Sequence, residues 1–362
     1  MRILHVITSL RIGGAEKLMV DLLPRLRDLG NEVELAVFDG VQTPFMEQLE
    51  KVGIKIHKFG INKNVYHPMN FIKLHSFFGQ FDIIHTHNTA CQLFAALDSI
   101  GTQQLLCTTE HSTSNRRRGK ILFESMDNWM YGRYKKIICI SKDTEINLHQ
   151  SVKGNFPSET CVINNGIDVK KYAAAFPLAK ECSEWSGKHI IMQIAAFREE
   201  KDQDTTIRAM KHLSEEYHAV FVGDGPRREF CEKIAKEIGV ENKCSFLGFR
   251  SEVPQLIKAA DIVVMSSHWE GFGLAAVEGM AAGKPVVASD VAGIREIVKD
   301  SGILFPPHDD RQLAREIIRL TEEKEYADQI IRQCQAKAAE YDIKVMAEKY
   351  NAVYQELCSK QK

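Results

Sequence analysis

The segment EGFGLAAVE carries the strongest chemical signal in the sequence. It follows the strand candidate Ile262–Met265 and predicts a glycine-flanked turn that opens a helix near Leu274. At such a start the N–H groups of Phe272, Gly273 and Leu274 have no intrahelical acceptor, and the helix dipole adds about half a positive charge. We therefore expect this helix start to bind an anion, with the glycines letting phosphate oxygens approach the backbone.

Two carboxylates flank this turn. Glu278 lies one helical turn beyond Leu274 on the same face, so its carboxylate reaches beside the anion, where a ribose diol is its natural partner. Glu270 precedes the turn and is placed to accept hydrogen bonds from sugar hydroxyls. The competing interpretation is that Glu278 caps the free amides and Glu270 is solvated.

A second cationic signal is AAFREEKDQD, which follows the strand candidate Ile190–Ala195. Arg198 and Lys201 stand three residues apart at the carboxyl end of this strand, so both can face one diphosphate and neutralise the charge of a leaving group. Exposed Arg and Lys side chains are more often simply solvated.

Asp202 and Asp204 form a DxD pair, a spacing that can hold Mn²⁺ or Mg²⁺. A helical pattern follows directly, so we expect Asp204 to be its N-cap and the cations to do the work of a metal. The sequence thus predicts no metal at the catalytic centre and no other cofactor.

The first half of the chain offers weaker signals. Gly13 and Gly14 follow the first strand candidate and open the first helix, where backbone can meet a phosphate or a sugar. His111 falls just past a strand and is placed to bond a sugar hydroxyl or assist an acceptor, although a lone histidine is more often structural. His85 and His87 alternate at a strand end; we favour hydrogen bonding there over metal ligation, since no third ligand has suggestive spacing.

A dense basic run covers Arg116, Arg117, Arg118 and Lys120, with Ile121 following directly. The ordinary interpretation is a solvated loop. The sharper alternatives are an acceptor phosphate or peripheral contact with the inner face of a membrane.

Elements of alternating type must position these residues. Val/Ile-rich runs alternate with helix-length amphipathic segments, which is typical of parallel sheets covered by helices. The strand candidates are Ile3–Ile7, Val33–Phe38, Ile54–His57, Ile83–Thr86, Leu105–Thr109, Ile137–Ser141, Cys161–Ile163, Ile190–Ala195, Ala219–Val222, Cys244–Leu247, Ile262–Met265, Val286–Ala288 and Ile303–Phe305. We expect a first helix from about Gly14 to Leu29 with Gly30 as its cap, a linker at Asp168–Lys188, and a terminal helix near Tyr341–Cys358.

Length and composition restrict the function classes. A chain of 362 residues with 44% hydrophobic and 26% charged residues predicts two globular α/β domains, at 1–170 and 171–340, with the terminal helix at 341–362. The formal net charge of −1 encodes no general attraction to nucleic acid. Nine cysteines without CxxC pairs indicate reduced thiols. Met1 leads directly into a strand and no run approaches about 20 apolar residues, so we expect a cytoplasmic protein.

Taken in order, these segments resemble the family 4 glycosyltransferases, the large retaining group with the GT-B fold, over nearly the whole chain. The motifs that carry the resemblance are the Gly-Gly loop, the His-x-His strand end, His111, CISK at Ser141, NNGID ending at Asp168, the Arg/Lys pair, VGDGP at Gly223–Pro226, FLGF at Phe246–Phe249 and Glu-x7-Glu. One departure is Phe197, which stands before Arg198 where the family commonly has glycine.

The resemblance implies two Rossmann-like domains facing each other across a cleft, with the acceptor bound mainly by the first domain, the nucleotide sugar mainly by the second, and the terminal helix crossing back to the first. It gives Glu278 the ribose, Glu270 the donor sugar, Arg198 and Lys201 the diphosphate, and the amides of Phe272, Gly273 and Leu274 the phosphate and sugar. Phe249 and Arg250 are expected to meet the base, while Gly14 and His111 close the cleft from the other side.

The function that the resemblance implies is a retaining transfer of a hexosyl or N-acetylhexosaminyl group from a nucleotide sugar. We favour UDP over GDP only as the commoner base, and expect a glycan or lipid-linked glycan acceptor in surface polysaccharide synthesis. The alternatives are an epimerase or phosphorylase of the same fold and a non-catalytic sugar-nucleotide-binding protein. A dinucleotide oxidoreductase is weaker, because SLRIGGAE lacks GxGxxG although Asp39 ends the second strand.

Overall fold

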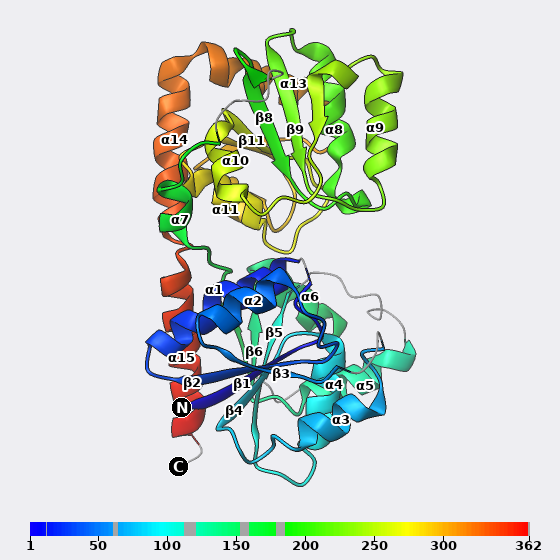
Figure 1. The fold of residues 1–362 in the computed structure, drawn as a ribbon, viewed down its shortest axis with the longest axis vertical. Coiled ribbons are helices and arrows are strands. Elements are labelled where there is room, and N and C mark those ends of the chain that lie inside the picture. Colours follow the sequence, from blue (N-terminus) through cyan, green and yellow to red (C-terminus); the bar gives the residue numbers. More distant parts are fainter. Residues whose placement is uncertain (12, 61–63, 112–120, 153–158, 179–184, 361–362) are drawn as a thin grey trace. The chain divides into compact units, whose positions relative to one another are not determined.

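The protein is described by a computed structural model that covers residues 1–11, 13–60, 64–111, 121–152, 159–178 and 185–360. The chain divides into two compact units (Figure 1). Unit 1 comprises Met1–Gly166 together with Ile343–Lys362, and unit 2 comprises Ile167–Asp342. The sequence-based boundaries at 170 and 340 lie within a few residues of these divisions.

Strands and helices alternate in both units. The elements of unit 1 are β1 (Arg2–Ile7), α1 (Gly14–Asp28), β2 (Glu32–Val37), α2 (Pro44–Lys51), β3 (Lys55–Lys58), α3 (Pro68–His75), β4 (Ile83–Thr86), α4 (Thr89–Asp98), β5 (Leu105–Glu110), α5 (Ile121–Tyr131), β6 (Lys136–Cys139), α6 (Lys142–Ser151), β7 (Glu159–Val162) and α15 (Ile343–Ser359). The elements of unit 2 are α7 (Val169–Ala173), β8 (His189–Ile194), η2 (Glu199–Lys201), α8 (Gln203–Ala209), η3 (Met210–His212), β9 (Tyr217–Val222), α9 (Arg228–Glu237), η4 (Glu241–Lys243), β10 (Cys244–Phe246), α10 (Val253–Ala259), β11 (Ile262–Met265), α11 (Leu274–Ala281), β12 (Val286–Ser289), α12 (Arg295–Val298), β13 (Ile303–Phe305), α13 (Asp310–Glu322) and α14 (Lys324–Ala339).

The two sheets share one topology. In the described residues unit 1 has a seven-stranded sheet of order β3-β2-β1-β4-β5-β6-β7, and unit 2 a six-stranded sheet of order β10-β9-β8-β11-β12-β13. All their strand pairs are parallel. In each sheet the order reverses between two adjacent strands, β1 and β4 in unit 1 and β8 and β11 in unit 2. Open α/β sheets bind ligands at the carboxyl ends of the strands beside such a reversal, so the site must be sought there.

Burial explains why these segments became strands. Alternate residues of β1 enter two cores: Ile3 and Ile7 pack on the α1 side, and Leu4 and Val6 pack on the α3 and α4 side. Strands covered on both faces need apolar residues on both, which is why the sequence showed continuous Val/Ile runs. The sequence predicted all thirteen described strands within two residues at each end.

The terminal helix α15 belongs to unit 1, where it packs against α1. Its buried residues recur at helical spacing: Ile343, Met346, Ala347, Tyr350, Val353, Tyr354 and Leu357. This apolar stripe joins the core on the α1 side of the sheet, so the helix covers a sheet whose strands lie far away in the sequence.

Helix α1 ends as the sequence predicted. Leu29 is its C-cap, and Gly30 follows with a φ of +86° and donates its N–H to the Arg27 carbonyl. The stretch expected to be a linker differs, because Asp168 caps helix α7 through a hydrogen bond from the Lys171 amide. A helix of five residues is too short to leave a recognisable helical pattern in the sequence.

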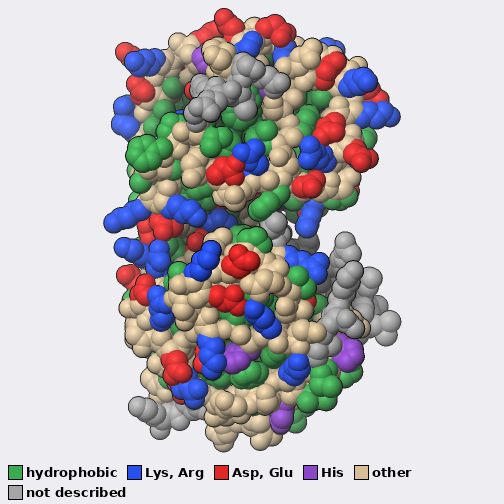
Figure 2. Space-filling view, in the orientation of Figure 1, with side chains coloured by type: hydrophobic (Ala, Val, Ile, Leu, Met, Phe, Trp, Pro, Cys, Tyr) green, Lys and Arg blue, Asp and Glu red, His purple; other side chains and the backbone are tan. Residues whose placement is uncertain are grey.

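Side chains of both charge signs lie on the visible surface of each unit. Figure 2 shows Lys and Arg side chains interspersed with Asp and Glu over each unit, as the near-zero net charge suggested. Among the described helices, none combines the length and the apolar character that a membrane span needs.

Candidate functional site

Lys201 and Glu270 meet at the strand reversal of unit 2. Lys201 ends the short helix η2 that follows β8, and Glu270 lies in the loop after β11, so the two adjacent strands deliver them to the same edge of the sheet. The Lys201 Nζ forms an ion pair and hydrogen bond with Glu270 Oε1, and Ser267 Oγ donates to the same oxygen at 3.1 Å. With side chains only 21% and 11% exposed, both charges are held in place.

The turn after Glu270 opens helix α11 at Leu274, as the sequence predicted. Gly273 caps it with a φ of +89°, a left-handed conformation that side chains disfavour. Phe272 is buried and meets the Tyr341 ring edge to face at 5.4 Å, which anchors the turn. The start of the helix, and with it the first-turn amides, therefore has a defined position beside Glu270.

Glu278 lies one turn into α11 and is 6% exposed. The Tyr172 hydroxyl, from helix α7, donates a hydrogen bond to Glu278 Oε1 at 2.5 Å. Tyr172 is itself buried, so its ring and hydroxyl fix where the carboxylate points. Sequence reasoning missed Tyr172 because it lies in the supposed linker; the N-cap residue Asp168 was the available signal.

Two glycines of VGDGP join the loops at this edge of the sheet. A Cβ at Gly223 would lie 2.0 Å from the Ala195 carbonyl oxygen, and one at Gly225 would lie 2.5 Å from that of Phe197. The loop after β9 thus contacts the loop that carries Arg198 and Lys201. Phe197 is completely buried between Phe221 and Phe246, and its φ is not among the positive values of the described residues.

The other residues predicted to bind the nucleotide-sugar donor take no part in the Lys201–Glu270 ion pair. Arg198 is 63% exposed, with its Nη1 3.8 Å from Glu200. Phe249 is 49% exposed in the loop after β10, and Arg250 donates from Nε to Glu252 at 2.6 Å. The structure therefore joins Lys201 to Glu270. Arg198 lies on the same loop as Lys201, Phe249 and Arg250 lie on the loop after β10, and none of the three is linked to that pair in the described residues.

The two aspartates of the DxD pair diverge. Asp204 is not the N-cap that the sequence predicted: helix α8 begins at Gln203, its N-cap is Asp202, and Asp204 lies inside the helix. Its carboxylate pairs with Arg227 at 2.7 Å, whereas Asp202 accepts from the Thr205 hydroxyl at 2.6 Å. Asp202 can precede the helix because it adopts a left-handed φ of +42°.

Unit 1 holds a chain of buried histidines at its own strand reversal. The contacts run from His111 Nε2 to His87 Nδ1 at 3.0 Å, from His87 Nε2 to His5 Nδ1 at 2.8 Å, from His5 Nε2 to Tyr354 Oη at 3.4 Å, from Tyr354 Oη to His85 Nδ1 at 2.6 Å, and from His85 Nε2 to Thr109 Oγ1 at 2.8 Å. Both ring nitrogens of each interior histidine are used, which matches the one donor and one acceptor of a neutral imidazole.

Burial keeps these imidazoles neutral. Desolvation lowers the pKa of His5 to about 3 and that of His111 to about 4. Burial, with the other imidazoles as a smaller cause, holds the pKa of His85 and His87 well below the usual range. His111 follows β5 and is partly exposed, so it is the member of this hydrogen-bonded series that can meet a ligand.

The other residues that the sequence assigned to unit 1 are less informative. Gly14 begins α1, and Gly13 precedes it with an extended backbone that any residue can adopt. Asp39 pairs with Arg11 at 3.3 Å. The basic run Arg116–Lys120 lies outside the described residues.

Comparison with known families agrees with this geometry. The model of the glycosyl transferases group 1 matches residues 179–337, and the model of Glycosyltransferase Family 4 matches residues 12–171. Between them they span most of the chain in the expected order. The chain belongs to the family 4 glycosyltransferases.

Relatives of this glycosyltransferase are similar over most of their length. The N-acetyl-alpha-D-glucosaminyl L-malate synthase of Bacillus anthracis is 28% identical over 87% of this chain and 86% of that protein. An Escherichia coli enzyme, UDP-Gal:alpha-D-GlcNAc-diphosphoundecaprenol alpha-1,3-galactosyltransferase, is 23% identical over 68% of this chain and 67% of its own length.

Solved structures establish the fold. Anabaena Alr3699/HepE in complex with UDP and glucose superposes with a TM-score of 0.86 at 24% identity, covering 98% of this chain and 100% of that chain. The two parallel Rossmann-like sheets are thus those of a GT-B glycosyltransferase, which confirms the predicted fold class.

Proposed function

We propose that this glycosyltransferase transfers a hexosyl or N-acetylhexosaminyl group from a nucleotide sugar, with UDP favoured over GDP, and retains the anomeric configuration. The observation that carries the proposal is the Lys201–Glu270 pair at the β8–β11 reversal, directly before the start of α11. A cation, a carboxylate and a helix start are the groups that a sugar diphosphate needs. The UDP and glucose in the Anabaena structure support the same donor class.

Each group has a distinct task in this proposal. The Lys201 ammonium has three donors, so it can hold Glu270 and a phosphate oxygen together. Arg198, exposed on the same loop, adds a second cation to the diphosphate. Glu270 receives the sugar hydroxyls, Glu278 receives the ribose diol, and the amides of α11 bind the phosphate and the sugar.

The proposed reaction needs no enzymic nucleophile. The acceptor hydroxyl attacks the anomeric carbon from the face that the nucleoside diphosphate leaves, through an oxocarbenium-like state. The departing phosphate takes the proton of the acceptor hydroxyl. Lys201, Arg198 and the helix amides stabilise the negative charge that develops on the leaving group, without a metal ion at the diphosphate.

For the acceptor we propose a glycan or a lipid-linked glycan of surface polysaccharide synthesis. The Escherichia coli relative supports this class, since its name specifies a diphosphoundecaprenol acceptor. In this proposal His111 and Gly14 of unit 1 serve the acceptor side, and the protein works at the cytoplasmic face of a membrane. His111 is suited to hydrogen bonding with a hydroxyl because its imidazole stays neutral.

A Lys201→Gln variant tests the assignment. We expect turnover to fall at least about a hundredfold, because a charge on the leaving group loses its principal stabiliser. Lys211→Gln, an exposed lysine on η3, is the matched control and should keep normal turnover. Near-normal turnover of Lys201→Gln, with its melting temperature unchanged, would remove Lys201 from the mechanism.

A product assay separates this function from its alternatives. Donor and acceptor are incubated together and apart, and NMR determines the anomeric configuration of the product. The proposal expects an α-linked product from an α-linked donor and only slow donor hydrolysis without acceptor. Epimerised donor or a sugar 1-phosphate would instead identify an epimerase or a phosphorylase.

A further inference from the structure

Three side chains from three loops converge next to the Lys201–Glu270 pair. Asp202 follows Lys201 after β8, His268 stands between β11 and Glu270, and His308 follows β13. His268 Nδ1 lies 3.5 Å and His308 Nδ1 lies 3.6 Å from the same oxygen, Asp202 Oδ2. The two imidazole rings are 4.5 Å apart, and one ligand atom from each residue lies within 4.8 Å of the others.

These separations suit a shared cation better than direct hydrogen bonds. Both exceed the usual N–H···O distance of about 2.7–3.2 Å. Metal bonds of about 2.0–2.2 Å at tetrahedral angles place neighbouring ligand atoms about 3.4 Å apart. His268 Nδ1 is moreover buried without a hydrogen-bond partner among the described residues, an arrangement that normally costs free energy.

The backbone and the surroundings of Asp202 fit a ligand role. Asp202 and His308 are two of the three non-glycine residues with positive φ in the described chain, at +42° and +65°. The Thr205 hydroxyl donates to Asp202 Oδ2 at 2.6 Å, the kind of contact that orients a metal-binding carboxylate. The His268 amide donates to the Glu200 carbonyl at 2.9 Å, which holds that loop against the loop after β8.

We propose that Asp202, His268 and His308 form a binding site for a divalent transition-metal ion of the zinc class. Two imidazoles and one carboxylate favour Zn²⁺, Co²⁺ or Ni²⁺ over Mg²⁺ and Ca²⁺, which prefer oxygen ligands. His308 is 66% exposed, so the site is accessible to ions from solution. The ion is structural: it ties together the loops that carry Lys201 and Glu270, and this role rests on the proposed function.

A second histidine triad shows why the assignment is selective. His5, His85 and His87 also lie within ligand distance of one another, and all three are fully buried. Their ring nitrogens are already paired with each other, with Tyr354 and with Thr109. Binding an ion there would break hydrogen bonds that nothing replaces.

Zinc affinity of the full chain tests the proposal. The protein is freed of metal by chelation and titrated with Zn²⁺ against a chromogenic chelator, and melting temperatures are recorded in parallel. We expect one zinc site per chain that the His308→Asn variant weakens at least about tenfold. Asparagine tolerates the left-handed backbone at this position, so the variant should fold normally.

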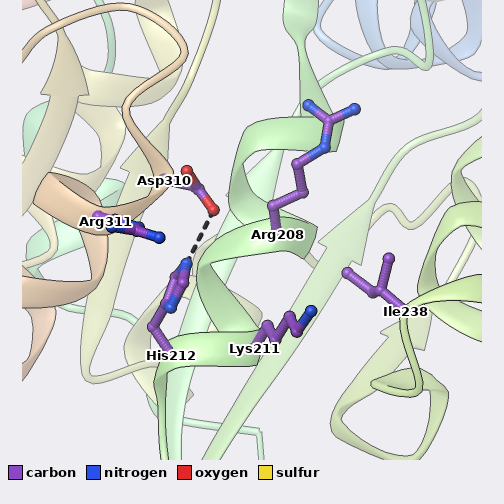
Figure 3. A pocket seen from close by; sticks show the side chains of 6 residues that line it. All are labelled: Arg208, Lys211, His212, Ile238, Asp310 and Arg311. Atoms are coloured by element: carbon purple, nitrogen blue, oxygen red, sulfur yellow. Dashed lines mark hydrogen bonds and ion pairs between the residues drawn. The ribbon is translucent and has the colours of Figure 1, made fainter.

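His212 provides the matched control. Its Nε2 lies 3.0 Å from Asp310, a comparable imidazole and carboxylate contact, but the same hollow is lined by Arg208, Lys211 and Arg311 (Figure 3). These three cations repel a metal ion, so no zinc should bind there and His212→Asn should leave zinc affinity unchanged. Equal zinc binding by the wild type, His308→Asn and Asp202→Asn would overturn the proposal.

The structural role has its own measurement. UDP binding is compared in zinc-loaded and zinc-free protein, and the role predicts several-fold tighter binding with zinc in the wild type and no difference in His308→Asn. No effect of zinc on UDP affinity in a protein that binds both would overturn the structural role. A protein that binds zinc but never UDP would instead refute the proposed donor site, so the two failures are distinguishable.

Discussion

At the scale of single residues, Glu278 shows how one hydroxyl can fix the orientation of a carboxylate. Its buried side chain accepts a hydrogen bond from Tyr172, which comes from a separate helix. A hydrogen bond to a charged group contributes about 1.5–3 kcal/mol when the group is buried. If Glu278 binds the ribose, Tyr172 must affect donor binding more than the chemical step.

Tyr172→Phe keeps the buried ring and removes the hydroxyl. We expect the KM for the donor to rise about tenfold, corresponding to about 1.4 kcal/mol, with little change in kcat. Steady-state kinetics with varied donor measure this split. The exposed Tyr66→Phe is the control, and a fall in kcat at constant KM would contradict the positioning role.

Residue spacing predicted which elements carry these side chains, and their roles in donor binding stay predictions. Lys201, Glu270 and Glu278 were identifiable because strand ends and a helix start fix which side chains reach one edge of a sheet. Tyr172 was not, because its contact depends on two helices packing together rather than on any local pattern. Asp204 was misjudged for a related reason: the local N-cap signal could not reveal Arg227, which lies 23 residues further along the chain.

At the scale of elements, the loops after β8 and β9 depend on glycine. A side chain at Gly225 would meet the Phe197 backbone. That backbone is itself held in place, because the Phe197 amide donates a hydrogen bond to the Asp224 carbonyl at 3.1 Å. The loop that carries Lys201 therefore owes its position to a contact with the neighbouring loop.

Gly225→Ala should displace this loop and lower the free energy of unfolding by more than about 2 kcal/mol, with weaker UDP binding. Gly239→Ala is the matched control, because its φ is +73° but no atom lies within 4 Å of the added Cβ. Gly239→Ala should lower the free energy of unfolding by about 1–2 kcal/mol, the cost of backbone strain alone, and should leave UDP affinity unchanged. Urea unfolding and UDP calorimetry measure both, and equal behaviour of the two variants would contradict the contact.

Whole strands were more predictable than loops. Parallel strands buried on both faces leave continuous apolar runs such as the IVVM of β11. Loops are specified by contacts between distant segments, so the sequence located their chemistry without showing their partners. The short helix α7 shows the same limit, since five residues contain little more than one turn.

At the scale of the whole molecule, the buried histidines make stability depend on pH. In the unfolded chain an imidazole titrates near about 6.5, whereas the pKa of folded His5 is about 3. Between these values the unfolded state binds a proton that the folded state does not. The contribution of neutral His5 to the free energy of unfolding is therefore fully present above about pH 6.5 and is lost as the pH falls towards the folded-state pKa of about 3.

Replacing His5 by Gln should remove about one proton from this dependence, or about 1.4 kcal/mol per pH unit below pH 6. Urea unfolding at several pH values measures the slope, which is informative even if the variant is less stable throughout. The exposed His149→Gln is the control and should keep the wild-type slope. An unchanged slope in His5→Gln would mean that His5 is not held neutral in the folded protein.

If unit 2 binds the donor as proposed, a diphosphate has one defined position in it. The most direct measurement is a crystal structure of the chain with UDP. We predict phosphate oxygens within hydrogen-bond distance of the Lys201 ammonium and of the amides that begin α11, with the ribose on Glu278. A diphosphate bound elsewhere, such as in the basic hollow of Arg208, Lys211 and Arg311, would contradict the account.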